Sequence, residues 1–168
     1  LTQTDPLGNT TTNTYDTYNL YPTTVQNALL DEQNFQYDYT IGKVTRVEDD
    51  DGTILETDYD GLRRPTQERR SSTTVAATLV TTQTWAYNDT SAPRSVTHKA
   101  YLDATTYLED ISYLDGLDRV VEVKTLDEDA TGYNETETTY DDLGRVASTT
   151  LPEASASSSY DASTVSSA

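Results

Sequence analysis

Side chains that could carry out catalysis are scarce in this chain, apart from its carboxylates. His98 is the only histidine and there is no cysteine, so a Ser–His–Asp set would have to use His98. This histidine lies in the alternating stretch Val96-Thr97-His98-Lys99, a pattern that predicts an ordinary strand residue. With 29 Asp and Glu among 168 residues, neighbouring carboxylates need no catalytic explanation. We therefore expect no catalytic residues, no enzymatic activity and no cofactor.

The acidic run Glu48-Asp49-Asp50-Asp51-Gly52 offers the hard oxygen ligands that Ca²⁺ prefers. It lacks the spaced ligands and the distant bidentate Glu of an EF-hand loop. An Asp-Gly turn with solvated charges accounts for the same residues. We prefer the turn, and we expect no metal site.

The composition leaves two structural classes open. A hydrophobic fraction of 34%, a mean hydropathy of −0.69 and a net charge of −18 are typical of disordered linkers. Thirteen tyrosines and many Thr and Val residues instead favour strands, and we expect an ordered β structure. The negative charge disfavours nucleic acid and anionic membranes as partners. No apolar run is long enough for membrane insertion.

Alternating side chains predict several strands. In residues 119–126, Val121 and Val123 lie on one face and Glu122 and Lys124 on the other, which is the pattern of a half-buried strand. The same period of two predicts strands at residues 54–59, 78–87 and 96–101, and the Thr/Val/Ala run at 71–84 predicts a lengthened hairpin.

Turn residues separate these strands. Asp51-Gly52, Asp60-Gly61 and Asp115-Gly116 place a glycine where a tight hairpin turn needs positive φ. The segment Asp5-Pro6-Leu7-Gly8 matches a type I turn. Each strand–turn–strand unit is therefore expected to be a β-hairpin.

A short phrase beginning with Tyr-Asp recurs along the chain. Tyrosines at positions 15, 37, 59, 87, 113 and 140 follow one another at intervals of 22 to 28 residues. A near-regular period of this length is typical of repeat proteins, in which each unit buries its apolar side by stacking on its neighbours. The residues that carry the repeat are Tyr37, Asp38, Gly42, Tyr59, Asp60, Gly61, Arg64, Tyr113, Asp115, Gly116, Arg119, Tyr140, Asp141, Gly144 and Arg145.

These phrases resemble the YD repeat of the Rhs family, best seen in Tyr59-Asp60-Gly61-Leu62-Arg63-Arg64 and Tyr140-Asp141-Asp142-Leu143-Gly144-Arg145. Arg63 and Asp118 stand where the commonest pattern has a second glycine, which this chain keeps as Gly144. The resemblance implies an all-β fold of tandem hairpins in a spiralling antiparallel sheet, an open segment of a larger hollow shell. Family members include shell proteins of bacterial Tc and Rhs toxins, wall-associated proteins and teneurins.

Two functions follow from this resemblance and from the expected fold. The first is a structural segment, at residues 1–152, of a secreted shell that encloses a C-terminal toxin or effector domain. The alternative is an extracellular or cell-surface adhesion module that forms filaments or binds glycans, because open sheet edges can pair with another chain. Residues 153–168 are expected to be a Ser/Ala-rich loop or the start of a further repeat. The partners expected in the shell are flanking repeats of one longer polypeptide, whose export signal would lie outside this sequence.

The repeated side chains have a structural and a binding interpretation. One Tyr per repeat, at a fixed turn position, is expected to pack against the next hairpin. Arg64, Arg119 and Arg145 would supply paired donors or stack on a ring of the neighbouring hairpin. Exposed tyrosines could instead stack on sugars. We prefer the structural role, because side chains fixed to the period serve the stack first.

Overall fold

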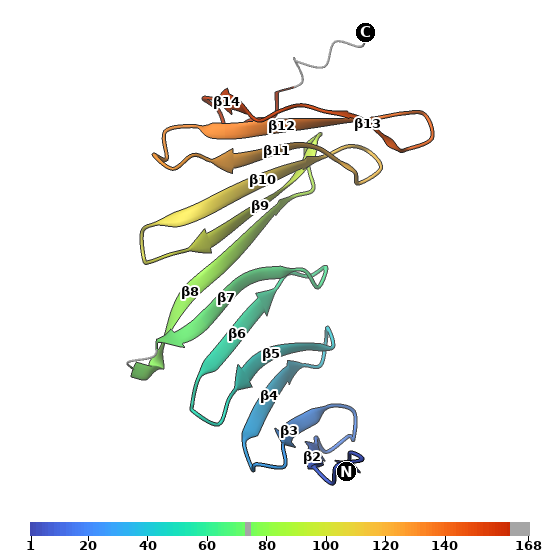
Figure 1. The fold of residues 1–168 in the computed structure, drawn as a ribbon, viewed down its shortest axis with the longest axis vertical. Coiled ribbons are helices and arrows are strands. Elements are labelled where there is room, and N and C mark those ends of the chain that lie inside the picture. Colours follow the sequence, from blue (N-terminus) through green and yellow to red (C-terminus); the bar gives the residue numbers. More distant parts are fainter. Residues whose placement is uncertain (73–74, 162–168) are drawn as a thin grey trace. The chain divides into compact units, whose positions relative to one another are not determined.

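Every regular element that the structure describes is a β-strand. The computed structural model describes residues 1–72 and 75–161, which contain fourteen strands (Figure 1). In chain order they are β1 (Thr2–Thr4), β2 (Thr10–Tyr15), β3 (Pro22–Gln26), β4 (Glu32–Asp38), β5 (Lys43–Glu48), β6 (Ile54–Tyr59), β7 (Pro65–Ser72), β8 (Val75–Asn88), β9 (Arg94–Tyr101), β10 (Tyr107–Leu114), β11 (Val120–Leu126), β12 (Tyr133–Tyr140), β13 (Val146–Thr149) and β14 (Glu153–Ser155).

The strands follow one another in the sheet in the order of the sequence. Strands β1 to β13 form one open antiparallel sheet, and β14 pairs with β12 beside β13. The expected all-β sheet of tandem hairpins is thus confirmed. By contacts the chain forms two compact units, Leu1–Gln83 and Thr84–Ala168, which are described separately below.

The period-two patterns located the strands correctly. The segment 54–59 is β6, the segment 119–126 contains β11, and the segments 78–87 and 96–101 lie within β8 and β9. The long hairpin expected at 71–84 is formed by β7 and β8, while the connecting residues 73–74 lie outside the described part of the chain.

An aspartate or asparagine begins most of the turns. In six of them its Oδ1 atom accepts hydrogen bonds from the backbone N–H groups two and four residues later, at 2.8 to 3.1 Å. The N–H three residues later donates to the carbonyl of the same residue, which closes a β-turn. The six turns start at Asp5, Asp16, Asn27, Asp60, Asp115 and Asp141.

The left-handed residue of these turns is not the one that the Asp-Gly pairs predicted. Gly61 and Gly116 do not have positive φ; the positive values fall two residues later, at Arg63 (66°) and Asp118 (62°). Gly144, at the equivalent place in its own turn, has φ of 78°. Gly52 does have the expected positive φ, of 79°. The left-handed backbone conformation therefore falls on the fourth residue of each of these turns, counted from the residue that begins it.

Alternation was correct for β11, but the face that is covered is the charged one. Glu122 and Lys124 are 1% and 0% exposed, while Val121 and Val123 on the other face are half-buried. Among the described residues the only buried apolar side chains are Ile54, Ile111 and Tyr113. The sheet therefore has almost no apolar core, so its stability depends on backbone ladders and polar cross-strand contacts.

We predict that Arg63→Gly stabilises the chain by about 1 kcal/mol, because a non-glycine residue in the left-handed region costs roughly that much. Denaturant unfolding would measure the change. Gly61→Ala is the matched control: nothing lies within 4 Å of its added Cβ, so it should leave stability unchanged or slightly higher. If Gly61→Ala were the destabilising member of the pair, the assignment of the strained position would be wrong.

Candidate functional site

Three of the repeat turns hold an arginine against the aspartate that begins them. In the turn of β6 and β7, Arg64 Nε and Nη2 both lie 2.8 Å from Asp60 Oδ2. The backbone N–H of Arg64 donates to the other oxygen of Asp60, and this hydrogen bond is the largest cause that lowers the pKa of Asp60. Asp115 with Arg119 and Asp141 with Arg145 repeat this two-pronged contact. The paired donors expected of the arginines therefore serve their own turn.

Tyrosines before the turns connect successive hairpins. The Tyr37 hydroxyl donates to the Pro22 carbonyl at 2.8 Å, and the Tyr59 hydroxyl donates to the Val44 carbonyl at 3.1 Å. Pro22 and Val44 are the residues that pair with the tyrosines of the preceding hairpins, Tyr15 and Tyr37, at a β-bulge. Each of these tyrosines thus binds the carbonyl next to the preceding turn, and the second hairpin is fixed to the first by more than its strand ladder.

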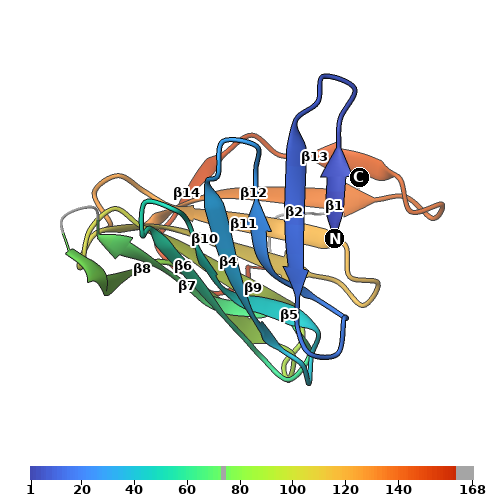
Figure 2. The ribbon, with the colours of Figure 1, turned by 90° about the horizontal axis from the view of Figure 1, so that it is seen from below.

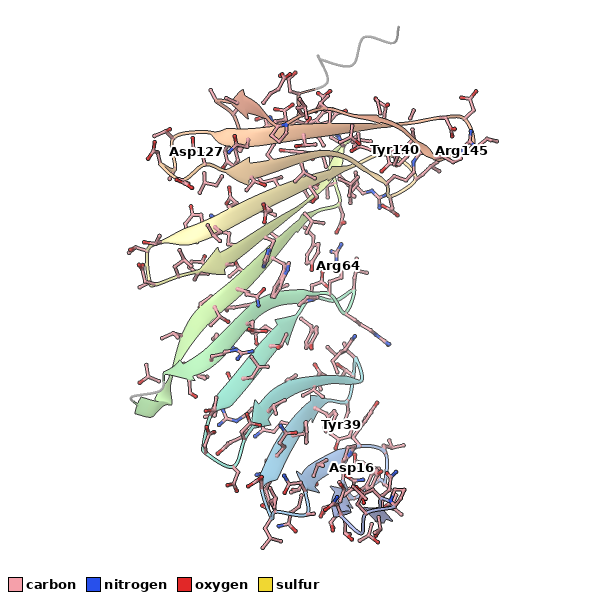
Figure 3. The ribbon with its side chains drawn as sticks, viewed as in Figure 1. Asp16, Tyr39, Arg64, Asp127, Tyr140 and Arg145 are labelled. Atoms are coloured by element: carbon pink, nitrogen blue, oxygen red, sulfur yellow. The ribbon has the colours of Figure 1, made fainter. Side chains whose placement is uncertain are left out.

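The same connection recurs in the second unit, with one difference. The Tyr140 hydroxyl donates to the Val120 carbonyl at 2.8 Å, and the Arg119 guanidinium lies 4.3 Å from the centre of the Tyr140 ring. This is the ring-stacking contact that the sequence suggested for the arginines. Figure 3 shows Tyr140 and Arg145 at one end of their hairpins and Asp127, which begins an opposite turn, at the other.

Tyr113 does not occupy the position of the other repeat tyrosines. The bulge of its hairpin lies between Tyr113 and Leu114, and Leu114 pairs with Val120, so Leu114 has the place that Tyr59 and Tyr140 have elsewhere. Tyr113 is one residue out of phase and lies on the opposite, covered face, 9% exposed. The spacing of tyrosines alone hid this shift, although the extra Leu before Asp115 indicates it.

Four tyrosines gather at one edge of the first unit. Tyr21 and Tyr37 stack at 4.7 Å between ring centres, and Tyr39 packs edge-on against Tyr18 and Tyr21 at 6.1 and 5.7 Å. The Tyr39 hydroxyl donates to Asp16 at 2.8 Å, and the two side chains are close together in Figure 3. Tyr18 and Tyr39 are 72% and 50% exposed, so one side of this cluster is open to solvent.

The acidic run of the first unit forms a turn. Asp49 begins it, since the Gly52 N–H donates to the Asp49 carbonyl at 2.9 Å, and Asp51 accepts the Thr53 N–H at 2.9 Å. The run borders a groove of about 550 Å³, but Asp49 Oδ1 already accepts a hydrogen bond from Gln33. The predicted turn is therefore present at these aspartates.

A buried group of charges in the second unit was not foreseen. Lys124 Nζ lies 2.8 Å from Glu135 Oε2 and 3.4 Å from Glu122 Oε1, on the face shared by β10, β11 and β12, which run side by side in Figure 2. Glu122, Glu135 and Glu137 each place a carboxylate oxygen within 4.8 Å of the others. The alternation of charged residues in β11 and β12 was visible in the sequence. These charges become a buried group only because another segment of the chain covers this face of the sheet.

The cover comes from residues 155–161, which we call the C-terminal strap. Lys124 Nζ donates to Ser155 Oγ and to the Ser157 carbonyl, both at 3.1 Å. Gly132 makes room for this approach, since a Cβ there would lie 2.9 Å from the Ser155 carbonyl oxygen. The part of the expected Ser/Ala-rich loop that the structure describes therefore belongs to the second unit.

Two hydrogen bonds and one contact between aromatic rings complete the attachment of the strap. The Tyr113 hydroxyl donates to the Ser158 carbonyl, and the Tyr160 ring lies 5.4 Å from that of Tyr113. The Asp161 N–H donates to Glu122 Oε2 at 3.1 Å. Backbone groups of the strap thus bind side chains of a sheet face more than 30 residues away in sequence.

Burial disfavours the charged form of both Glu122 and Lys124, but their neighbours change the outcome for Lys124. It raises the pKa of Glu122, an effect that the Asp161 N–H and Lys124 oppose and that Glu135 reinforces. Burial also opposes the charged form of Lys124, but its hydrogen bond to Glu135 and the charges of Glu122 and Glu135 outweigh this and raise the pKa of Lys124. The ammonium therefore stays charged and supplies the positive charge that a metal ion would bring to these carboxylates.

His98 lies on β9, as the alternation around it predicted. The His98 ring stacks on Trp85 at 5.2 Å and 20°, as expected of a strand residue. Its cross-strand partner in the ladder is Asp110, whose Oδ1 accepts a hydrogen bond from Thr125.

Comparison with known proteins leaves the family open. No protein-family model and no curated protein matches the chain. The described residues include no helix able to cross a membrane. The resemblance to the YD repeat therefore rests on the phrases in the sequence alone.

We predict that Tyr140→Phe lowers the free energy of unfolding by about 1 kcal/mol, because it removes the hydrogen bond from the Tyr140 hydroxyl to the Val120 carbonyl. The phenylalanine ring keeps the contact with Arg119. Tyr18→Phe is the control, since Tyr18 is exposed, and urea unfolding of both variants makes the comparison. Equal stabilities would mean that the hydroxyl contributes nothing between hairpins.

Lys124→Met should cost far more, roughly 3–5 kcal/mol, because it leaves buried carboxylates without their ammonium. Thermal or urea unfolding would measure the loss, with Lys43→Met at the exposed start of β5 as the matched control. A loss no larger than that of the control would show that the charge of Lys124 is not needed on this face.

Proposed function

We propose that this chain is a non-enzymatic structural segment of a longer YD-repeat array, which by its resemblance encloses a toxin or effector domain. The observation that carries the proposal is the bond between hairpins. Tyr37, Tyr59 and Tyr140 each bind a carbonyl of the hairpin before them. Such bonds serve stacking, because each fixes one unit to its predecessor and can be repeated without limit along an array.

The open ends of the sheet favour further repeats on either side. Strand β1 pairs with β2 through three residue pairs, and the other end is formed by the short strands β13 and β14. Unpaired strand edges bind other strands unless they are covered. Flanking repeats of the same polypeptide would cover both edges.

Exposed leucines at the turn tips also suit a larger assembly. Leu62, Leu117 and Leu143 follow the aspartates of three repeat turns by two residues and are 69 to 77% exposed. Their backbone N–H groups close the turns, so the turn does not need an apolar side chain there. Contact with a neighbouring part of the parent protein accounts for them.

A second candidate is an adhesion or filament-forming module at the cell surface. The exposed rings of Tyr18 and Tyr39 favour it, because aromatic faces at an edge can stack on sugars, and the open edges allow copies to pair. It requires no enclosed effector, and it places the mature chain outside the cell, as the shell proposal does.

The native polypeptide distinguishes the two candidates. We expect the protein isolated without denaturation to be many times longer than 168 residues, with a separately cleaved C-terminal product that co-purifies with it. Intact mass, sequencing of both termini and sedimentation of the undenatured material would test this. A mature chain of about the present length, recovered as a polymer or bound to glycan, would refute the shell proposal and establish the second candidate.

A further inference from the structure

The C-terminal strap covers a sheet face that carries more negative than positive charge. Three carboxylates of this face, those of Glu122, Glu135 and Glu137, lie within 4.8 Å of one another. The positive charge among them is Lys124, at 2.8 Å from Glu135 and 3.4 Å from Glu122. Unscreened like charges at such distances repel strongly where water is excluded, so the closed arrangement favours a proton on one carboxylate.

Glu122 is the carboxylate best placed to take that proton. Its side chain is 1% exposed, and its Oε1 atom accepts no hydrogen bond. Its Oε2 atom accepts the Asp161 N–H at 3.1 Å, which joins the end of the strap to the charged face. A proton on Oε1 neutralises the buried carboxylate without breaking the bond to the strap, because Oε2 remains the acceptor. It weakens only the ion pair of Oε1 with Lys124, at 3.4 Å.

The other groups that face Glu122 come from every element around it. On β10 the facing group is Tyr113, on β11 Lys124, and on β12 Glu135 and Glu137; the strap adds Tyr160 and Asp161. Glu109, farther along this face, is paired with Lys99 at 2.9 Å and accepts the Tyr133 hydroxyl at 2.6 Å. The carboxylates of Glu135 and Glu137 therefore oppose ionisation of Glu122, while the ammonium of Lys124 and the Asp161 N–H favour it.

We propose that the C-terminal strap is a proton-controlled clamp, closed on the sheet face while Glu122 is protonated and released when Glu122 ionises. Release lets water reach the new charge and separates Asp161 from the acidic face. The direction follows from linkage. Burial raises the pKa of Glu122 in the closed state, so the closed state holds the proton more tightly than the open one. Closure is strongest below the ordinary glutamate pKa and weakens as pH rises through the raised value.

This clamp differs from the proposed architectural role, because it controls a surface and does not build the array. Opening would expose Lys124 and the three carboxylates at the place where the polypeptide continues past residue 161. Acidity would therefore decide whether this charged surface is covered or open to solvent.

Amide hydrogen exchange tests the clamp in the intact chain. After correction for the intrinsic pH dependence of exchange, we expect the protection of the Asp161 N–H to fall by up to about tenfold per pH unit as Glu122 ionises. The amides of the β10–β11 ladder report global unfolding and should stay protected. A carboxyl-carbon NMR titration of Glu122 in the same sample would give its pKa directly.

Glu122→Gln imitates the protonated side chain and should keep the strap closed at every pH, with flat Asp161 protection. Asp110→Asn is the matched control: it removes one carboxylate from β10 at a residue bonded to Thr125, and it should keep the wild-type pH profile. Wild-type protection that does not change with pH would overturn the clamp even if neither variant folds. Protection that appears only on adding Ca²⁺ would also overturn it, by assigning the carboxylates to a metal.

Discussion

In each repeat turn the hydrogen bonds of a single aspartate side chain set the geometry on which the sheet depends. An Oδ1 atom that accepts two backbone N–H groups, two and four residues later, fixes where a strand ends and where the next one starts. Each turn is thereby closed by polar groups and needs no apolar core. This explains how a chain with a net charge of −18 and three buried apolar side chains among its described residues can still form long antiparallel ladders.

Repeating this turn creates a second level of order. In the hairpins of Tyr37, Tyr59 and Tyr140 the tyrosine before the turn lies at the β-bulge, and its hydroxyl reaches the carbonyl beside the preceding turn. Where one leucine is inserted before Asp115, the tyrosine moves to the other face and binds the C-terminal strap instead. A local shift of one residue thus separates a tyrosine that connects hairpins from one that helps to cover them.

The sequence was sufficient for a fold of tandem hairpins and for the strands at residues 54–59, 78–87, 96–101 and 119–126, since alternation and turn signals are local. It was not sufficient for Gly61 and Gly116, because the aspartate side chain moves the left-handed residue to Arg63 and Asp118. Nor could it identify the covered face of β11. A period of two places Val123 and Lys124 on opposite faces, but it does not predict which face residues 155–161 cover. These residues decide which of the two side chains is buried.

The spacing of the turns also limits how such a chain can change in length. From Asp5 to Asp60 a turn begins every 11 residues, at 5, 16, 27, 38, 49 and 60. Successive turns lie alternately at the two ends of the strands. Deleting 11 residues removes one strand and one turn, so every later strand would have to run in the opposite direction. The later tyrosine turns would then lie at the opposite ends of the strands. Deleting 22 residues removes one whole hairpin and leaves every later residue on its own face and every later turn at its own end of the strands. Among gains and losses of whole strands, only those of complete hairpins therefore leave the rest of this part of the chain unrearranged.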